Sequence, residues 1–265
     1  MPEGATPELK PLKVAEYDSK QSKYKHMVEC GKLPVRGAIL AKSGGGKTQL
    51  LANLILDVYK GCMERWHIFS PLCKPGLDTT WDEVRKYVYG EMGTPLEEQC
   101  FFWEWDPNKL AEIIEKQEKI VMHLRKAGKR KMFNIGVILD DYADRADVFR
   151  NPRGSKLLQT LAISGRHRFI STWFSTQSYR MLHNTIRKNC THNYIFRVSQ
   201  ADIKAWVEEN ADHYDEKTLM KIYRYAVDYE PYSFLYAILN ATDVKKAYMR
   251  KFSTFLVPIQ NGDPS

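Results

Sequence analysis

A glycine-rich segment near the start of the chain has the composition of a phosphate-binding loop. Glycine-rich backbone can turn its N–H groups toward a chain of phosphates, and the positive end of a following helix adds attraction. In this segment we expect Lys47 to contact the β- and γ-phosphates and the Thr48 hydroxyl to hold Mg²⁺. We therefore predict that ATP and Mg²⁺ bind to the segment Ala41, Lys42, Ser43, Gly44, Gly45, Gly46, Lys47, Thr48 and Gln49.

The first position of the loop departs from the common pattern G-x-x-x-x-G-K-[ST], because Ala41 stands where glycine is usual. A glycine-rich turn beside a chance lysine would give a similar pattern. The flanking elements favour the phosphate site, since Val35–Leu40 reads as a short apolar strand and Thr48–Tyr59 as a helix with one apolar face. A strand, a glycine-rich loop and a helix in this order are the context that such a site requires.

Two aspartates at the end of another apolar run could complete the site. Ile135–Leu139 has the look of a fully buried parallel strand, and Asp140 and Asp141 follow it directly. We expect Asp140 to hold Mg²⁺ through water, and Asp141 to position and deprotonate an attacking water molecule. The alternative is that both aspartates only cap the strand and begin a turn.

A third apolar run, Phe169–Phe174, ends in Ser175, Thr176 and Gln177. Ligands of parallel sheets bind beyond the carboxyl ends of the strands, so we expect Thr176 and Gln177 beside the same phosphates. The neutral amide of Gln177 could bond the γ-phosphate or the water. The alternative is a turn residue that faces solvent.

Further patterns indicate the elements that hold these residues in place. Asp106 and Pro107 predict the start of a helix, and Ser199 with Asp202 resembles a capping box. Strands that alternate with helices imply an α/β fold with a mostly parallel central sheet and helices on both faces. We divide the chain into an N-terminal arm (1–34), a catalytic core (35–210) and a C-terminal extension packed on that core (211–265). Additional strands are expected at 66–70, 101–105, 194–198 and 233–239.

The charge of the chain is unevenly distributed. Lysine and arginine total 40 against 32 acidic residues, which gives a net charge of +8. Uncompensated basic surface attracts polyanions, so a segment without acids indicates a nucleic-acid or nucleotide-phosphate partner, with a merely solvated surface as the alternative. Residues 148–201 form such a segment, with the basic residues Arg150, Arg153, Lys156, Arg166, Arg168, Arg180, Arg187, Lys188 and Arg197.

Composition excludes several other classes of protein. The 265 residues are 43% hydrophobic and 27% charged, which excludes wholesale disorder. No apolar run approaches the ~20 residues of a membrane span, and the first residues contain no apolar signal segment. The five cysteines are odd in number and contain no C-x-x-C, so we expect a reducing intracellular setting with neither a disulfide scaffold nor a zinc site.

Several motifs occur in the order seen in one group of viral enzymes. They are the loop at 41–48, Ile138–Asp141, Gly165–Arg168, the strand that ends at Gln177, and Ile186–Asn189. Over about residues 30–200 the chain resembles the DNA-packaging ATPases of the poxvirus-like double-stranded DNA viruses, a branch of the FtsK/HerA superfamily. Relatives often carry glutamate where this chain has Asp141.

The resemblance implies a RecA-like P-loop NTPase that couples ATP hydrolysis to the movement of double-stranded DNA, most simply of a viral genome into its capsid. It also implies a homo-oligomeric ring, a pentamer or hexamer, with capsid protein as a further partner. The expected location is the virion or an intracellular site of virus assembly, in the host cytoplasm or nucleus. Two rival functions fit the same residues: a cellular or mobile-element DNA-pumping or helicase ATPase, and a nucleotide-dependent assembly switch without translocation.

The family further implies an arginine that reaches the nucleotide of a neighbouring subunit. Arg166 and Arg168 match, and they precede the strand that ends at Gln177. They should therefore lie toward the opposite end of the sheet from their own phosphates, where such a residue could act in trans. Alternatively, they face DNA or cap the preceding helix, and Arg187 is the second candidate for the role in trans.

Overall fold

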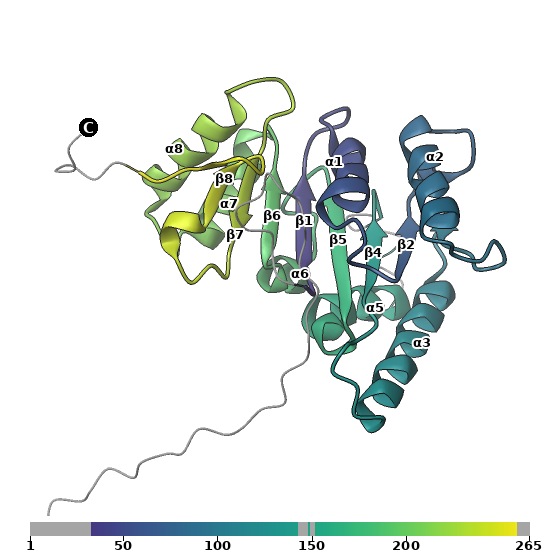
Figure 1. Ribbon diagram of the computed structural model, residues 1–265. Helices are drawn as coiled ribbons and strands as arrows, with labels where there is room; N and C mark the ends of the chain where they lie inside the picture. Colours follow the sequence, from purple (N-terminus) through teal and green to yellow (C-terminus); the bar gives the residue numbers. More distant parts are fainter. Residues whose placement is uncertain (1–32, 143–147, 149–151, 259–265) are drawn as a thin grey trace, which may run out of the picture.

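The computed structural model describes residues 33–142, 148 and 152–258 (Figure 1). Almost all of the predicted N-terminal arm lies outside this part of the chain, as does Arg150. The strands of the described part form one sheet in the order β3-β2-β4-β5-β1-β6-β7-β8-β9. In chain order, they are β1 (Arg36–Leu40), β2 (Arg65–Phe69), β3 (Phe101–Phe102), β4 (Ile135–Leu139), β5 (Ile170–Thr176), β6 (His192–Ile195), β7 (Leu235–Ile238), β8 (Tyr248–Arg250) and β9 (Thr254–Phe255).

Pairing between the strands divides the sheet into two parts. The strands from β3 to β6 pair in parallel, and β7, β8 and β9 add antiparallel pairs beyond β6. The mostly parallel α/β sheet expected from the sequence is therefore confirmed. Because β1, β4 and β5 run in the same direction, the residues that follow them meet at one edge of the sheet.

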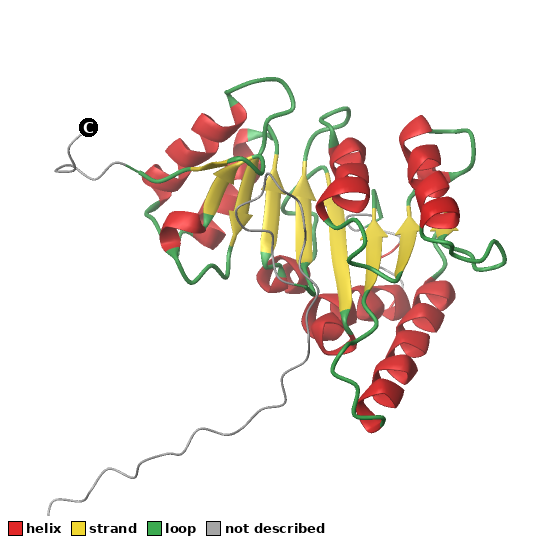
Figure 2. Ribbon diagram, in the orientation of Figure 1, coloured by secondary structure: helices red, strands yellow, loops and turns green. Residues whose placement is uncertain are grey.

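Helices cover both faces, as predicted (Figure 2). One face is covered by α1 (Lys47–Asn53) and α2 (Thr79–Lys86). The first of these helices continues as a π-helix over Leu54–Val58. Side chains of the longer helices fill the core of the opposite face. These are α3 (Pro107–Lys126), α5 (Pro152–Ser164), α7 (Gln200–Asn210) and α8 (Glu216–Val227), together with the short α6 (Asn184–Asn189).

Alternation along the strands separates two apolar cores. In β1, Ala38 and Leu40 belong to the core under α5 to α8, whereas Ile39 belongs to the core under α1 and α2. In the second core a tryptophan ring lies directly on the β4 backbone, since a Cβ added at Gly136 would lie 2.2 Å from the ring of Trp66. Only glycine permits this approach, which explains Gly136 within an otherwise apolar strand.

Two predicted strands differ in extent from the observed ones. The strand expected at 101–105 ends at Phe102, because the chain turns there toward the N-terminus of α3, which Asp106 caps through the N–H of Asn108. Trp105 then packs on Phe69 inside the core. The strand expected at 194–198 spans His192–Ile195 instead. The sequence patterns did not predict α2, α6, α8, β8 or β9.

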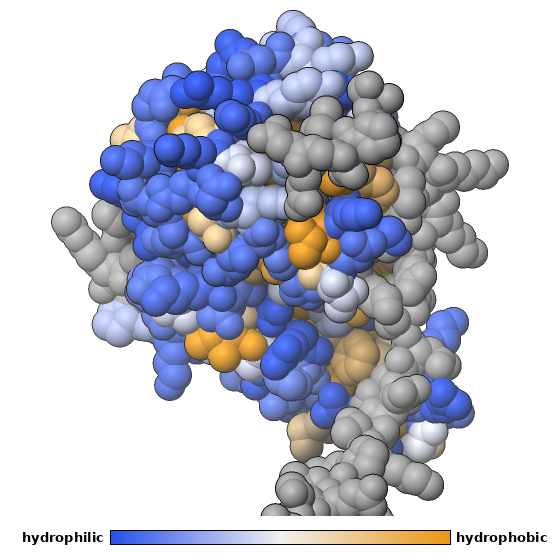
Figure 3. All heavy atoms as spheres, turned by 90° about the vertical axis from the view of Figure 1, so that its left-hand side faces the viewer, coloured by the Kyte–Doolittle hydropathy of each residue, from blue (hydrophilic) through white to orange (hydrophobic). Residues whose placement is uncertain are grey.

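Residues after 210 continue the same sheet, with α8 packed against β7 and β8. Seen from this side, the surface is largely hydrophilic and is broken by small, separate hydrophobic areas (Figure 3). Among the described helices, none combines the length and the hydropathy needed to cross a membrane.

Candidate nucleotide-binding site

The glycine-rich loop connects β1 to α1 at the carboxyl edge of the sheet. Its first residue, Ala41, is fully buried, and its N–H donates to the carbonyl of Thr176 at the end of β5 (3.2 Å). Gly44 and Gly46 adopt left-handed backbone conformations, with φ of +68° and +98°. These angles turn the backbone tightly enough that α1 starts directly after the loop. No side chain caps α1, so its first N–H groups are available to an anion.

Lys47, the first residue of α1, lies almost completely buried behind the loop. Its Nζ is 3.4 Å from the carbonyl oxygen of Ala41 and 3.6 Å from Oδ1 of Asp141. Thr48 is partly exposed in the first turn of the helix. The outer side of the loop faces solvent through Lys42, Ser43, Gly44 and Gln49.

Asp140 is buried at the end of β4 between two serines. The Ser175 hydroxyl of β5 donates to Oδ1 at 2.6 Å, and the Ser70 hydroxyl, just after β2, donates to Oδ2 at 3.0 Å. Burial raises the pKa of Asp140 to about 6, although both hydroxyl donors favour the charged form and oppose the rise. The carboxylate is therefore fixed in orientation by the two strands that flank β4.

The Asp141 side chain has different surroundings from the Asp140 side chain. Its backbone is left-handed (φ 55°), and its N–H donates to the Ser175 hydroxyl at 3.1 Å. Aspartate tolerates this conformation better than most residues, and the turn directs its side chain toward Lys47. About a third of the Asp141 side chain is exposed, whereas Asp140 is nearly inaccessible. The two carboxylates thus have separate surroundings, one enclosed and one open to water.

Gln177 follows β5 and is exposed, while Thr176 is buried. The bond between Ala41 and Thr176 places the end of β5 beside the start of the loop. The loop, the two aspartates and Gln177 therefore gather at one edge of the sheet, where a phosphate chain bound to the loop would lie between them.

The residues at this edge suit Mg²⁺. Thr48 and Asp140 offer a hydroxyl and a carboxylate oxygen, and hard oxygen ligands are those that Mg²⁺ prefers together with water and phosphate. Within the described ranges, no group of three or more His, Cys, Asp or Glu could hold a metal ion by itself. This donor set fits a cation that is bound jointly with phosphates.

Two serines of this site, Ser70 and Ser175, were not singled out from the sequence. Each stands at the carboxyl end of a strand that pairs directly with β4. In the sequence, each of these serines is visible only as a hydroxyl residue at the end of an apolar run. It gains meaning only when the strand order is known.

Arg166 and Arg168 lie in a single 3₁₀ turn (Gly165–Arg168) that precedes β5, at the opposite end of that strand from Gln177. Arg168 pairs with Glu118 of α3 (3.1 Å) and donates to the Ser164 hydroxyl (2.7 Å). Arg166 is exposed. Neither arginine is near the loop of its own chain, because the length of β5 lies between the arginines and the loop.

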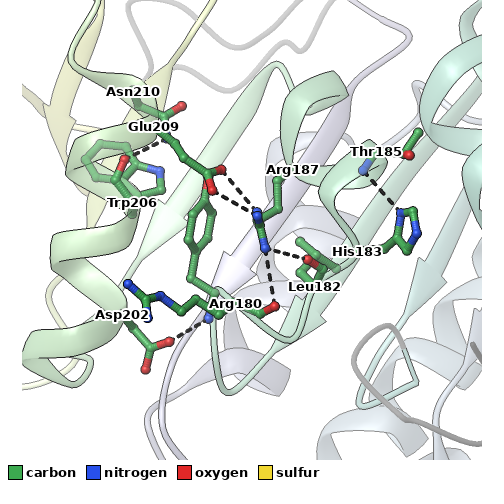
Figure 4. Close-up of polar contacts among 10 residues, drawn as sticks. Arg180, Leu182, His183, Thr185, Arg187, Asp202, Trp206, Glu209 and Asn210 are labelled. Carbon is green, nitrogen blue, oxygen red and sulfur yellow. Dashed lines mark hydrogen bonds and ion pairs between the residues drawn. The ribbon is translucent and has the colours of Figure 1, made fainter.

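Arg187 of α6 is held within its own subunit (Figure 4). Its guanidinium makes a two-pronged ion pair with Glu209 of α7, at 2.9 and 3.1 Å. It also donates to the carbonyls of Arg180 and Leu182 and lies over the Tyr179 ring. Only 14% of the side chain is exposed. These contacts give Arg187 a structural role in joining α6 to α7.

Part of the basic charge in residues 148–201 is neutralised in space. Arg168, Arg187 and Arg197 form ion pairs with acidic residues from other segments: Glu118, Glu209 and Asp228. The inference that this charge is uncompensated is wrong for these three residues. Folding brings acids to them from both sides of the segment, which a linear count cannot show.

A strand–loop–helix phosphate site, with a lysine beside an aspartate at the carboxyl edge of a mostly parallel sheet, defines a P-loop ATPase of the RecA-like type. Residues 22–230 match the family described as Poxvirus A32 protein. The chain belongs to this family. The resemblance to viral packaging ATPases drawn from the motifs is thereby confirmed.

Similar solved structures carry the same fold. The genome packaging NTPase B204 from Sulfolobus turreted icosahedral virus 2, in complex with AMP, is 13% identical, with a TM-score of 0.52 over 84% of this chain and 99% of that one. The pCW3 conjugation coupling protein TcpA is 17% identical, with a TM-score of 0.57 over 92% and 70%. ATPases 2 and 3 of EssC from Geobacillus thermodenitrificans are 14% identical, with a TM-score of 0.55 over 94% and 48%. No curated protein matches the sequence significantly.

Proposed function

We propose that this chain hydrolyses ATP to drive double-stranded DNA into a viral capsid at the site of virus assembly. The observation that carries the proposal is the convergence of Lys47, Asp140 and Asp141 at one edge of the sheet, in a chain of the poxvirus A32 family. The named viral neighbour, B204, is itself a genome packaging NTPase of the same fold.

In this proposal each charged group has a separate task. Lys47 contacts the β- and γ-phosphates, and Thr48 and Asp140 hold Mg²⁺, which neutralises phosphate charge when bound. Asp141 accepts the proton of the attacking water, because it is the carboxylate that water can reach. Gln177, exposed at the same edge, orients the water or the γ-phosphate.

The motor acts as a homo-oligomeric ring of five or six subunits around the duplex. Arg166 or Arg168 lies at the far end of β5 from its own loop and completes the site of the neighbouring subunit. Exposed basic residues such as Arg180 and Lys188 contact DNA phosphates without reading bases, since a ring that travels along DNA cannot depend on sequence. Capsid protein is the remaining partner.

The test is ATP turnover by the full chain with and without duplex DNA, at several salt concentrations. We expect duplex to stimulate turnover, and log K for DNA to fall with log salt at a slope near −3 if about three or four phosphates are neutralised. Lys47→Ala should remove turnover in both conditions. Turnover indifferent to DNA would favour an assembly switch, and a strong sequence preference would contradict a motor that tracks the DNA backbone.

A further inference from the structure

A cavity of about 660 Å³ opens beside the last glycine of the phosphate loop. Gly46 and the outer side of α1, with Gln49 and Asn53, form one wall. The other walls come from the segments that follow β6, precede β7 and follow β8, and they are mainly aromatic: Phe196, Tyr232, Phe234 and Phe252. The size is that of a pocket for a small organic molecule.

The strand register brings these segments together. Ile195 of β6 pairs with Leu235 of β7, and Leu235 pairs with Arg250 of β8. The residues next to them, Phe196, Phe234 and Lys251, therefore emerge at the same end of the sheet, beside the loop. Three segments far apart in the sequence thus build one wall.

Tyr232 is an exposed aromatic residue held against the loop. Its side chain is 67% exposed, and its backbone is left-handed (φ 59°) in the turn between α8 and β7. A Cβ added at Gly46 would lie 3.3 Å from the Tyr232 ring and 3.4 Å from the Phe196 ring. The aromatic surface therefore begins at the point where the phosphate-binding backbone ends.

The wall opposite α1 is fixed by contacts that do not involve the loop. Lys251 pairs with Glu230, and its N–H donates to the carbonyl of Phe234 (2.9 Å). The Phe252 ring stands edge-on to Phe234 and Tyr236, both at 5.3 Å between centroids. Because these contacts already tie the β8–β9 turn to β7, this wall is formed before a ligand arrives.

We propose that this cavity binds the nucleoside part of the nucleotide, with the base stacked on the Tyr232 ring; this rests on the proposed ATPase function. A nucleotide whose phosphates lie on the loop must place its base a short distance beyond Gly46, and a flat heterocycle gains most from aromatic faces. The amides of Gln49 and Asn53, 3.2 Å apart, offer a donor and an acceptor to the edge of a base.

A second cavity, of about 490 Å³, shares Phe196 and Tyr232 with the first and touches the loop at Gly45. Its lining includes the charged residues Arg197, Asp228 and Glu230 as well as the Tyr229 ring, and Arg197 and Asp228 are paired with each other at 2.6 Å. Phe234 and Phe252 line only the first of these two cavities, which therefore offers a base more aromatic surface and fewer charged neighbours. The aromatic cavity is therefore the one assigned to the nucleoside.

Calorimetric binding of ATP and of inorganic tripolyphosphate, both with Mg²⁺, tests the assignment on the full chain. Tyr232→Ala should weaken ATP binding on the order of 10-fold or more while tripolyphosphate binding stays the same, because only ATP carries a base. Tyr232→Phe should retain the affinity for ATP. The matched control is Tyr225→Ala, since Tyr225 is equally exposed (65%) on α8 and does not line the cavity.

The outcomes separate this inference from the proposed function. Wild-type chain that binds neither ATP nor tripolyphosphate would overturn both. Wild-type chain that binds both, with Tyr232→Ala still preferring ATP as strongly, would overturn only the nucleoside site. A second measurement needs no variant: photolabelling of the wild-type chain with 2-azido-ATP should mark residues 232–234 or 251–253. Labelling confined to other segments would also overturn the assignment.

Discussion

Lys47 and Asp141 lie together at the edge of the sheet, with the lysine Nζ 3.6 Å from a carboxylate oxygen. The lysine is buried behind the loop, whereas a third of the aspartate is exposed. The cation that we expect to hold phosphate and the carboxylate that we expect to act as base therefore meet here, although they are far apart in the chain. Phosphates that bind to the loop would draw Lys47 to themselves and leave Asp141 to the attacking water.

Asp141→Asn should retain ATP binding and lose hydrolysis by 100-fold or more, because an amide cannot accept the proton of the water. Lys47 would remain in place, and Asp140 and Thr48 would still hold Mg²⁺. The measurement is ATP affinity beside single-turnover hydrolysis, with Asp140→Asn for comparison. If Asp141→Asn costs as much binding as Asp140→Asn, the two carboxylates do not have separate roles.

Ser175→Ala should lower turnover about 10- to 100-fold and raise the Mg²⁺ concentration needed for half-maximal rate. The Ser175 hydroxyl contacts both aspartates, as donor to Asp140 and as acceptor from the Asp141 N–H. Its loss would therefore leave Asp140 to the Ser70 hydroxyl and remove a contact that holds the Asp141 backbone. Ser171→Ala is the matched control, since Ser171 is a buried serine on the same strand, far from the site, and accepts from the Val35 N–H. Equal effects of the two variants would mean that Ser175 only supports the strand.

Ala41→Gly should change nucleotide affinity by less than ~1 kcal/mol. Ala41 is buried, its backbone is not left-handed, and its N–H is already bonded to Thr176. Alanine therefore meets no obstacle at the position where the loop pattern has glycine. A large gain in ATP affinity, measured by titration against wild type, would instead show that the Ala41 methyl group restrains the loop.

The loop and the aspartates could be predicted because each stands at the end of a local pattern. An apolar run followed by glycines or by two carboxylates can be read without knowing the neighbours of the strand. The contacts of Asp140 could not be predicted, because Ser70 and Ser175 reach it only through the order β2-β4-β5. Strand order is a property of the folded sheet, and no short segment encodes it.

The aromatic cavity was beyond sequence reasoning for a related reason. Its aromatic residues follow β6, precede β7 and follow β8, and they meet through antiparallel register. The strands β8 and β9 are three and two residues long, too short to show alternation. The same limit explains the error about basic charge, since Arg187 and Glu209 pair across two helices.

Acid should destabilise the fold through two buried histidines. Burial lowers the pKa of His67 to about 4 and that of His192 to about 3, so both stay neutral in the folded chain while the unfolded chain takes up protons below about pH 6.5. Stability is therefore complete above pH 6.5 and is lost as pH falls toward these lowered values. For His67 alone, the loss between pH 7 and pH 5 should be about 2 kcal/mol.

Urea unfolding at pH 7, 6 and 5 measures this loss. His67→Gln should make the free energy of unfolding depend less on pH, because glutamine does not titrate. His123→Gln is the control, since His123 is exposed on α3. A pH dependence that is identical in wild type and His67→Gln would show that His67 does not contribute.

The arginine that acts in trans is expected to be Arg166 or Arg168. Arg166 is exposed, whereas Arg168 is held by Glu118 and Ser164, so Arg166 is the freer of the two to reach a neighbour. Removal of the acting arginine should leave ATP binding to the isolated subunit intact, because its own loop and carboxylates are unchanged. Turnover should fall ~10³-fold or more, the scale of arginine-finger losses.

Mixed rings identify which arginine acts. Subunits with Arg166→Ala and subunits with Asp141→Asn should each be nearly inactive alone. At a mixed interface, the intact Asp141 of one subunit can meet the intact Arg166 of its neighbour, so part of the activity should return. The same mixture with Arg168→Ala tests the other candidate. If neither mixture recovers turnover although the subunits demonstrably co-assemble, the sites are not shared between subunits, and these arginines are better assigned to DNA contact or to capping α5.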